Sequence, residues 1–158
     1  MKLSRKSHQQ LENFFRDYFN DKDLKLPDVE LFVKRGAGLI TKVFKIYGIT
    51  FGQFIFIRDD FLYRNERAQL CISKDLLVHE LTHVLQYKKL GWFRFFYTYL
   101  KSYWRALKQK EKWDLAARNQ SYLEIPHEVE ARDCSAKFLE WTRKVNSEKR
   151  KMRIHQEF

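Results

Sequence analysis

Two histidines stand four residues apart in the segment DLLVHELTHVLQY, which runs from Asp75 to Tyr87. At about 100° per residue, His83 follows His79 by roughly 40° and one turn, so a helix directs both imidazoles to one side. Four apolar residues fall on the opposite side of the same helix: Leu77, Leu81, Val84 and Leu85. The spacing therefore predicts a helix with one apolar face for packing and a separate face that carries two potential metal ligands.

Glu80 directly follows the first histidine and completes the pattern H-E-x-x-H. A catalytic zinc site of two imidazoles and one carboxylate keeps a fourth position for water, and zinc lowers the pKa of that water towards about 7. A neighbouring carboxylate can accept the proton, so we predict Glu80 as the general base. The alternative is a helix whose histidines lie at a surface or in a satisfied core.

A third ligand has to come from a later segment, and the best candidate is IPHEVEARDCSAKFLEW, residues 125–141. Four residues share the side of this predicted helix that carries Glu128: Ala131, Ser135, Phe138 and Leu139. Glu130 points about 200° away from Glu128. An inward carboxylate without a cationic partner is costly, and a metal ion supplies the charge. We therefore predict Glu128 as the third ligand and Glu130 as a solvated surface residue.

HELTH followed by PHEVEA resembles the gluzincin branch of zinc metallopeptidases, in which a glutamate of an E-x-x-A helix is the third ligand. LLVHELTHVLQYKKLG and YLEIPHEVEA are similar, more narrowly, to small bacterial zincin-like domains, the minigluzincins, and the likeness covers about residues 48–139. The resemblance implies a zincin-like fold and one Zn²⁺ per chain, held by His79, His83 and Glu128 with Glu80 as base. It also implies an extended peptide substrate paired with an edge strand around residues 51–57.

The chain departs from the larger gluzincins at two points. Arg132 stands where they often carry an aspartate that supports the first histidine, and Asp75 or Asp133 are candidates to take over that role. The residue that stabilises the oxyanion has no clear counterpart. Tyr122 and His127 are candidates for it, with a packed tyrosine and a surface histidine as the alternatives.

The remaining sequence fits a single α+β domain of 158 residues. Residues 7–19 have the spacing of an amphipathic helix, and the β-branched and aromatic residues of 29–57 predict two to four antiparallel strands. Residues 58–69 read as a polar connector. Further helices are predicted over 73–90, capped by Ser73 or Asp75 and ended by Gly91, over 91–113, and from Pro126 to about Val145. A loop is expected around Asn119 and Gln120, and a frayed basic tail over 146–158.

The formal net charge of +11 raises the affinity for anionic partners without choosing among them. Residues 91–113 interleave aromatic and basic side chains, which is typical of an interfacial membrane helix or a nucleic-acid surface. The alternative is a core-packing helix with a solvated basic back, which could also cover the zinc cleft. Peripheral contact with an anionic membrane is the favoured use of this segment over nucleic acid.

The chain has no apolar run of about 18 residues and no apolar core of a signal peptide, so we expect a cytoplasmic protein. Cys71 and Cys134 form no CxxC pair and are expected to be reduced thiols, with a single disulfide as the alternative.

The sequence thus predicts a zinc metallopeptidase that hydrolyses peptide bonds in a peptide or protein substrate. One alternative is a non-catalytic, zinc-stabilised interaction module with a basic aromatic surface for membrane or nucleic acid. Glu80 argues against it, because structural zinc sites usually close the fourth position with protein. The other is a nucleic-acid or membrane-surface binder in which the histidine pair is incidental.

Overall fold

The computed structural model describes residues 1–33, 48–64, 66 and 70–156 of the chain. The first half contains α1 (Arg5–Phe19), β1 (Glu30–Val33), β2 (Gly48–Phe51), β3 (Phe54–Ile57), the short 3-10 helix η1 (Asp59–Phe61), β4 (Leu62–Arg64) and β5 (Leu70–Ile72). The second half is helical, with α3 (Lys74–Leu90), α4 (Trp92–Lys108), α5 (Leu115–Leu123) and α6 (Pro126–Gln156). The predicted α+β class is therefore confirmed.

The main sheet has three strands in the order β1-β3-β2. β3 runs antiparallel to β2 but parallel to β1, so the prediction of an antiparallel sheet is wrong. Strand composition does not encode direction, and residues 34–47, where part of the predicted sheet falls, lie outside the described residues. β2 and β3 are joined by a tight turn in which Gly52 has a positive φ of 60°, a conformation that glycine adopts at little cost.

β4 and β5 form a second, two-stranded antiparallel sheet, with Tyr63 opposite Cys71. The prediction of a polar connector over 58–69 is therefore wrong for residues 59–64, which form η1 and β4. Strands of only three residues, one of them carrying Arg64, are too short to show an alternating pattern. Cys71 is half-buried and Cys134 is buried, and the structure shows no disulfide between them.

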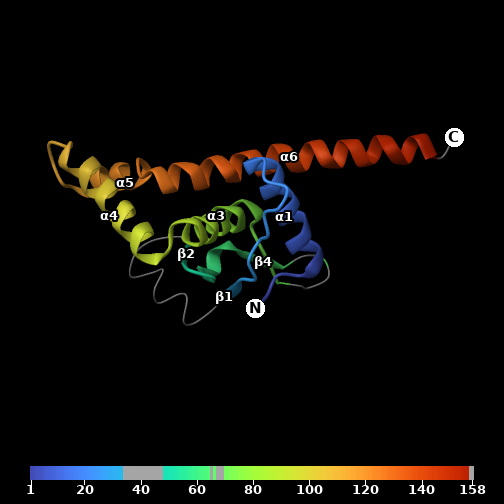
Figure 1. Ribbon diagram of the computed structural model, residues 1–158, viewed down its shortest axis with the longest axis horizontal. Coiled ribbons are helices and arrows are strands. Elements are labelled where there is room, and N and C mark those ends of the chain that lie inside the picture. The colour runs from blue at the N-terminus through green and yellow to red at the C-terminus, as the bar shows by residue number, and fades with distance from the viewer. Residues whose placement is uncertain (34–47, 65, 67–69, 157–158) are drawn as a thin grey trace.

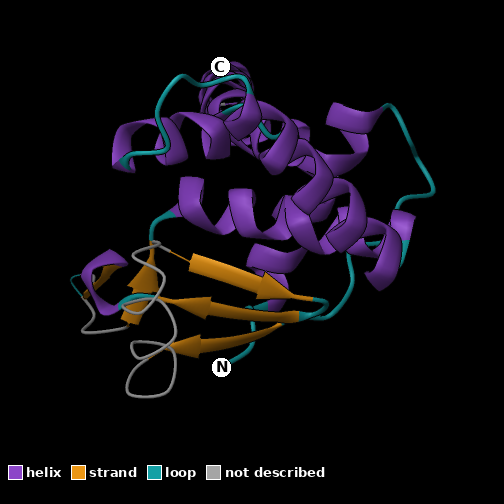
Figure 2. Ribbon diagram, turned by 90° about the vertical axis from the view of Figure 1, so that its left-hand side faces the viewer, coloured by secondary structure: helices purple, strands orange, loops and turns teal. Residues whose placement is uncertain are grey.

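α3 forms the middle layer of the molecule, with the main sheet on one side and α6 on the other (Figures 1 and 2). Leu77, Leu81 and Val84 are buried, as predicted for the apolar face. Polar residues of α3 are buried as well: Thr82, His83 and Gln86 on the side that α6 covers, and Glu80 against β2. The helix is thus enclosed between two layers rather than half exposed.

The core joins α1, the sheet, α3 and α6. Phe14 of α1 packs edge-on against Phe138 of α6, with ring centroids 5.0 Å apart. Leu31, Ile55 and Ile57 supply the sheet side. α6 is the longest element and spans the top of Figure 1, where its first turns lie over α3 and its middle lies beside α1. This packing brings residues from both ends of the chain against the central helix.

The predicted helices are found with shifted ends. α5 replaces the loop expected around Asn119 and Gln120, and Asp114 caps it by accepting a hydrogen bond from Ala117 N at 2.8 Å. α6 begins at Pro126 as predicted but continues to Gln156 instead of ending near Val145, since its charged residues are good helix formers. α4 ends at Lys108 rather than near residue 113.

The remaining helix predictions concern α1 and α3. α1 begins at Arg5, two residues before the predicted start. Gly91 ends α3 as predicted, but Ser73 makes no side-chain cap and instead hydrogen bonds the carboxylate of Asp75. Within the described residues, no helix is long and apolar enough to cross a membrane.

Candidate metal centre

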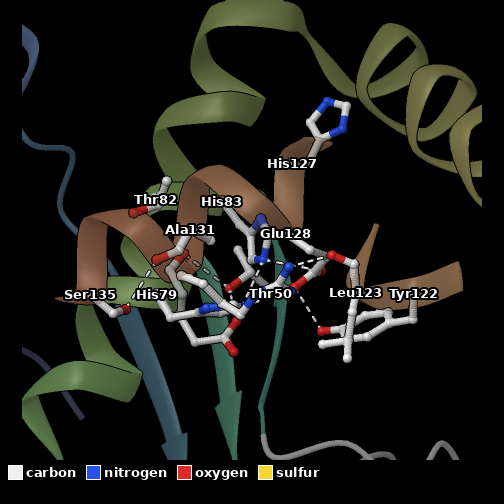
Figure 3. A network of polar contacts seen from close by, with 12 residues as sticks. Thr50, His79, Thr82, His83, Tyr122, Leu123, His127, Glu128, Ala131 and Ser135 are labelled. Carbon is white, nitrogen blue, oxygen red and sulfur yellow. Dashed lines mark hydrogen bonds and ion pairs between the residues drawn. The ribbon is translucent and has the colours of Figure 1, made fainter. Parts of the chain in front are cut away.

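His79 and His83 of α3 lie one turn apart with their rings on the same side of the helix (Figure 3). Their Nε2 atoms are 3.3 Å apart and their ring centroids 4.9 Å apart. His83 is buried, whereas His79 is half-buried. The helical spacing alone produces this arrangement, as the sequence predicts.

Glu128 comes to the same point from the first turn of α6. Its Oε2 lies 3.2 Å from His79 Nε2, its Oε1 lies 3.4 Å from His83 Nε2, and only 3% of the residue is exposed. The three side chains form a cluster whose ligand atoms all lie within 4.8 Å of one another, so they could hold a metal ion. Glu128 points inward as predicted, together with the buried Ala131 and Phe138, while Leu139 is exposed.

Glu128 is held as a carboxylate by four donors. Burial alone would raise its pKa, but hydrogen bonds from His79 and His83 lower the pKa well below its ordinary range. Two phenols add to this set: Tyr99 OH donates to Oε1 at 2.8 Å and Tyr122 OH donates to Oε2 at 2.7 Å. Burial, followed by the charge of Glu128, raises the pKa of both tyrosines, so both are neutral donors at pH 7.

Glu80 lies beside the cluster and is held by β2. Thr50 Oγ1 donates to Glu80 Oε2 at 2.6 Å, and both residues are buried. Burial raises the pKa of Glu80, against the lowering effects of His83, His79 and the Thr50 hydrogen bond. A Cβ at Gly48 would collide with the same carboxylate, so a glycine leaves the space that Glu80 occupies.

Gln86 fixes the orientation of the His83 ring. His83 Nδ1 donates to Gln86 Oε1 at 2.8 Å, so Nε2 is the nitrogen that would release its proton and bind a metal ion. Gln86 Nε2 in turn donates to Glu130 Oε2 at 2.7 Å and to the carbonyl of His127 at 3.1 Å. Glu130 is therefore half-buried and tied to α3 through Gln86, and its prediction as a solvated surface residue is wrong.

The two candidates for oxyanion stabilisation lie differently. Tyr122 touches Glu128 directly, as described above, whereas the His127 ring points away from the ligand cluster (Figure 3). His127 packs edge-on against Phe95 at 4.9 Å, and its Nε2 lies 3.3 Å from the Thr98 hydroxyl. Burial lowers the pKa of His127. This placement supports Tyr122 alone in the proposed role.

The residues considered for support of His79 have other partners. The carboxylate of Asp133 accepts a hydrogen bond from Tyr18 at 2.7 Å and pairs with Lys137 at 3.0 Å. Asp75 binds Ser73, as described above. Arg132, at the position where larger gluzincins carry aspartate, donates to the carbonyl of Leu123. Arg132 therefore ties α6 to the end of α5, next to Tyr122.

A cavity of about 160 Å³ opens beside the cluster. β2 forms one wall with residues 48–51, and α4 forms another with Phe95, Phe96 and Tyr99. β3 is the central strand, so the edge strand expected around residues 51–57 is instead β2, Gly48–Phe51. Among the described strands, β2 pairs with β3 alone, and its residues line the cavity.

Three residues of this site were not predicted from the sequence: Thr50, Gln86 and Tyr99. Thr50 and Tyr99 make their contacts across a tertiary interface, whereas Gln86 contacts His83 within α3, at a spacing of three residues that many helical pairs share. Comparison of the chain with protein-family models, with curated proteins and with solved structures finds no match.

Proposed function

We propose that the chain is a zinc-dependent metallopeptidase of the gluzincin type, with a zincin-like fold. The observation that carries the proposal is the cluster of three potential ligands. Atoms at about 2.0–2.1 Å from a tetrahedral zinc are about 3.3–3.4 Å apart. His79 Nε2 and His83 Nε2 are 3.3 Å apart, and they lie 3.2 Å from Oε2 and 3.4 Å from Oε1 of the Glu128 carboxylate, respectively. Two imidazoles and a carboxylate are also the donor set of catalytic zinc sites with an open position.

Zinc bound there would supply Lewis-acid chemistry, activating a water molecule and polarising the scissile carbonyl. Glu80 acts as general base and takes a proton from the attacking water. Thr50 holds the Glu80 carboxylate in place through its 2.6 Å hydrogen bond, so the base is oriented before substrate arrives. Gln86 keeps the His83 lone pair directed into the site through Nδ1.

Tyr122 stabilises the negative charge that develops on the carbonyl oxygen during attack. Its hydroxyl is a neutral donor that already points at the ligand cluster through Glu128 Oε2. Arg132 fixes the end of α5 beside it. The substrate is an extended peptide that pairs with the edge of β2 that no other described strand occupies, since residues 48–51 line the cavity.

One observation favours a second candidate function, a zinc-stabilised interaction module without activity. The cavity of about 160 Å³ is smaller than the roughly 300–1,000 Å³ typical of ligand pockets. Tyr99 and Phe95 of α4 lie over it. A peptide substrate therefore requires this space to widen, whereas a non-catalytic module does not.

Metal analysis together with Glu80→Gln separates the two functions. For a peptidase we expect about one zinc per chain, hydrolysis of a peptide library by the wild type, and loss of hydrolysis with zinc retained in Glu80→Gln. Glu111→Gln, at an exposed position, is the matched control and keeps full activity. Wild-type protein that holds zinc but cleaves no peptide supports the module, and wild-type protein that binds no zinc contradicts both functions.

A further inference from the structure

α4 carries a second apolar face that the metal centre does not use. Four exposed residues stand on it at i, i+4, i+7 and i+11, which we call the α4 stripe: Phe93, Tyr97, Leu100 and Trp104. At about 100° per residue they fall within roughly 60° of one another. Phe93 is 94% exposed, and the other three are between 48% and 64% exposed.

The opposite face of α4 is already anchored to the protein. Phe95 and Ala106 are buried, and Tyr99 donates to Glu128. The helix therefore does not need the α4 stripe to attach to the fold. A contiguous exposed apolar surface of this kind marks an interaction site, because scattered exposure alone would not align four large side chains.

Cationic residues follow one side of the α4 stripe. Four of them lie roughly 60–120° round the helix from Phe93 and form what we call the basic flank: Arg94, Lys101, Arg105 and Lys108. All four are exposed, and Lys101 Nζ lies 5.6 Å from the centroid of the Tyr97 ring. α4 contains no acidic residue. The surface thus combines apolar bulk with positive charge and has no negative charge of its own.

The apolar patch continues past the end of the helix. Trp113 lies with its ring centroid 6.0 Å from that of Trp104, and both side chains are about half exposed. Leu115, at the start of α5, is 65% exposed. Tryptophan and tyrosine are the side chains that favour the boundary between lipid and water, since their rings are apolar and their N–H or O–H groups stay hydrated.

We propose that the α4 stripe docks on the surface of an anionic lipid bilayer, with the basic flank against the headgroups. An interfacial helix of this type buries its apolar face at the headgroup boundary, and its basic residues are attracted to anionic lipid. The docking surface goes beyond the proposed peptidase function and does not depend on a bound metal.

Charge and residue type favour a bilayer over other occupants. A second copy of the chain would bring two basic flanks together on molecules of net charge +11 each, which opposes association. Nucleic acid stacks its bases on aromatic rings, but Leu100 lies in the middle of the stripe and the cations lie beside it rather than among its residues.

Vesicle binding of the full chain tests this proposal. We expect the wild type to sediment with vesicles of phosphatidylcholine and phosphatidylglycerol, to bind pure phosphatidylcholine far more weakly, and to be released by salt. Phe93→Ala/Leu100→Ala should weaken binding at least tenfold, by the loss of about two buried apolar side chains. Phe54→Ala/Leu139→Ala removes the same residue types from exposed positions elsewhere and should bind like the wild type.

A second pair of variants tests the basic flank, and the two variants have the same net charge as each other. Lys101→Glu/Lys108→Glu should weaken binding more than Arg143→Glu/Lys144→Glu, which places the same charge change on α6. Circular dichroism verifies that each variant is folded.

Three outcomes overturn the proposal. The first is wild type that ignores anionic vesicles, and the second is a stripe variant that binds them as the wild type does. The third is a wild type that has no affinity for vesicles but forms a dimer, seen by light scattering, or binds DNA, and a stripe variant that loses that dimer or that DNA binding.

Discussion

Thr50 and Glu80 are joined by a 2.6 Å hydrogen bond between the Thr50 hydroxyl and Glu80 Oε2, deep in the protein. Thr50 belongs to the edge strand of the main sheet and Glu80 to the central helix. Tyr87 OH also donates to the Thr50 carbonyl at 3.2 Å, so strand and helix are linked twice at this point. The position of the proposed general base therefore depends on a residue that is 30 positions earlier in the chain.

Thr50→Val should uncouple the base from the strand. Loss of a hydrogen bond to a carboxylate that stays buried lowers the free energy of unfolding by about 1.5–3 kcal/mol. Zinc content stays unchanged, because Thr50 touches none of the three ligands, while peptide hydrolysis falls. Urea unfolding and zinc analysis measure these effects, with Thr50→Ser, which keeps the hydroxyl, as the control. A Thr50→Val protein as stable and active as Thr50→Ser would contradict the role given to this hydrogen bond.

Gln86→Ala should weaken zinc binding. Without the acceptor for Nδ1–H, the His83 ring can rotate or change tautomer, and removal of such a partner costs about 10–100-fold in metal affinity. Competition with a chelator of known affinity measures the change. Gln120→Ala, at an exposed position on α5, is the control. If the two variants have equal zinc affinity, Gln86 does not position His83.

Tyr99→Phe and Tyr122→Phe should each destabilise the metal-free chain, since each removes a donor to the buried Glu128 carboxylate. We expect a loss of about 1.5–3 kcal/mol for each variant. The free energy of unfolding that the double variant loses should differ from the sum of the two single losses, because both hydroxyls act on one carboxylate. Tyr97→Phe, on the exposed side of α4, should leave stability unchanged. Additive effects, or none, would show that the hydroxyls do not share Glu128.

The stability of the metal-free chain should depend on pH through Glu128. Burial raises its pKa, but hydrogen bonds from His79 and His83 outweigh this and lower the pKa below its ordinary value of 4.5. A carboxylate with a lowered folded-state pKa contributes stability above its unfolded pKa and loses it as the pH falls through the folded value.

Urea unfolding of the wild type and of Glu128→Gln, both with chelator, measures this contribution. The difference in unfolding free energy between them should therefore shrink as the pH falls below about 4.5. A difference that stays constant or grows in acid would mean that Glu128 is not held as a buried carboxylate.

The histidine pair and Glu80 could be predicted because a helix of known period fixes their relative positions within one turn. Glu128 could be predicted because its helix has one small and apolar side, and a carboxylate on that side needs a cation. Both inferences use local geometry only. The three residues meet because α6 packs on the side of α3 that carries the histidines.

Other features could not be predicted because they depend on contacts between distant segments. A helical wheel divides a helix into one inner and one outer side, and it therefore predicts that the Glu130 side chain faces solvent. In the structure Gln86 reaches across from α3 and binds Glu130. Tyr99 was counted among the aromatic residues of a basic helix, and its bond to Glu128 appears only once α4 lies over the cavity.

The relative direction of the strands could not be predicted from the sequence either. The alternation of buried and exposed residues is the same in parallel and antiparallel strands, so β1 and β3 gave no sign of running parallel. The basic and aromatic composition of α4 indicates an interaction surface, but only its buried face in the structure separates the residues that pack from those that are exposed.

Anomalous diffraction at the zinc edge, from crystals of the zinc-loaded chain, tests the central claim most directly. The account predicts one peak at about 2.0–2.2 Å from His79 Nε2, His83 Nε2 and a carboxylate oxygen of Glu128. A structure with no peak at this cluster, or with zinc held while Glu128 lies out of reach, would contradict it.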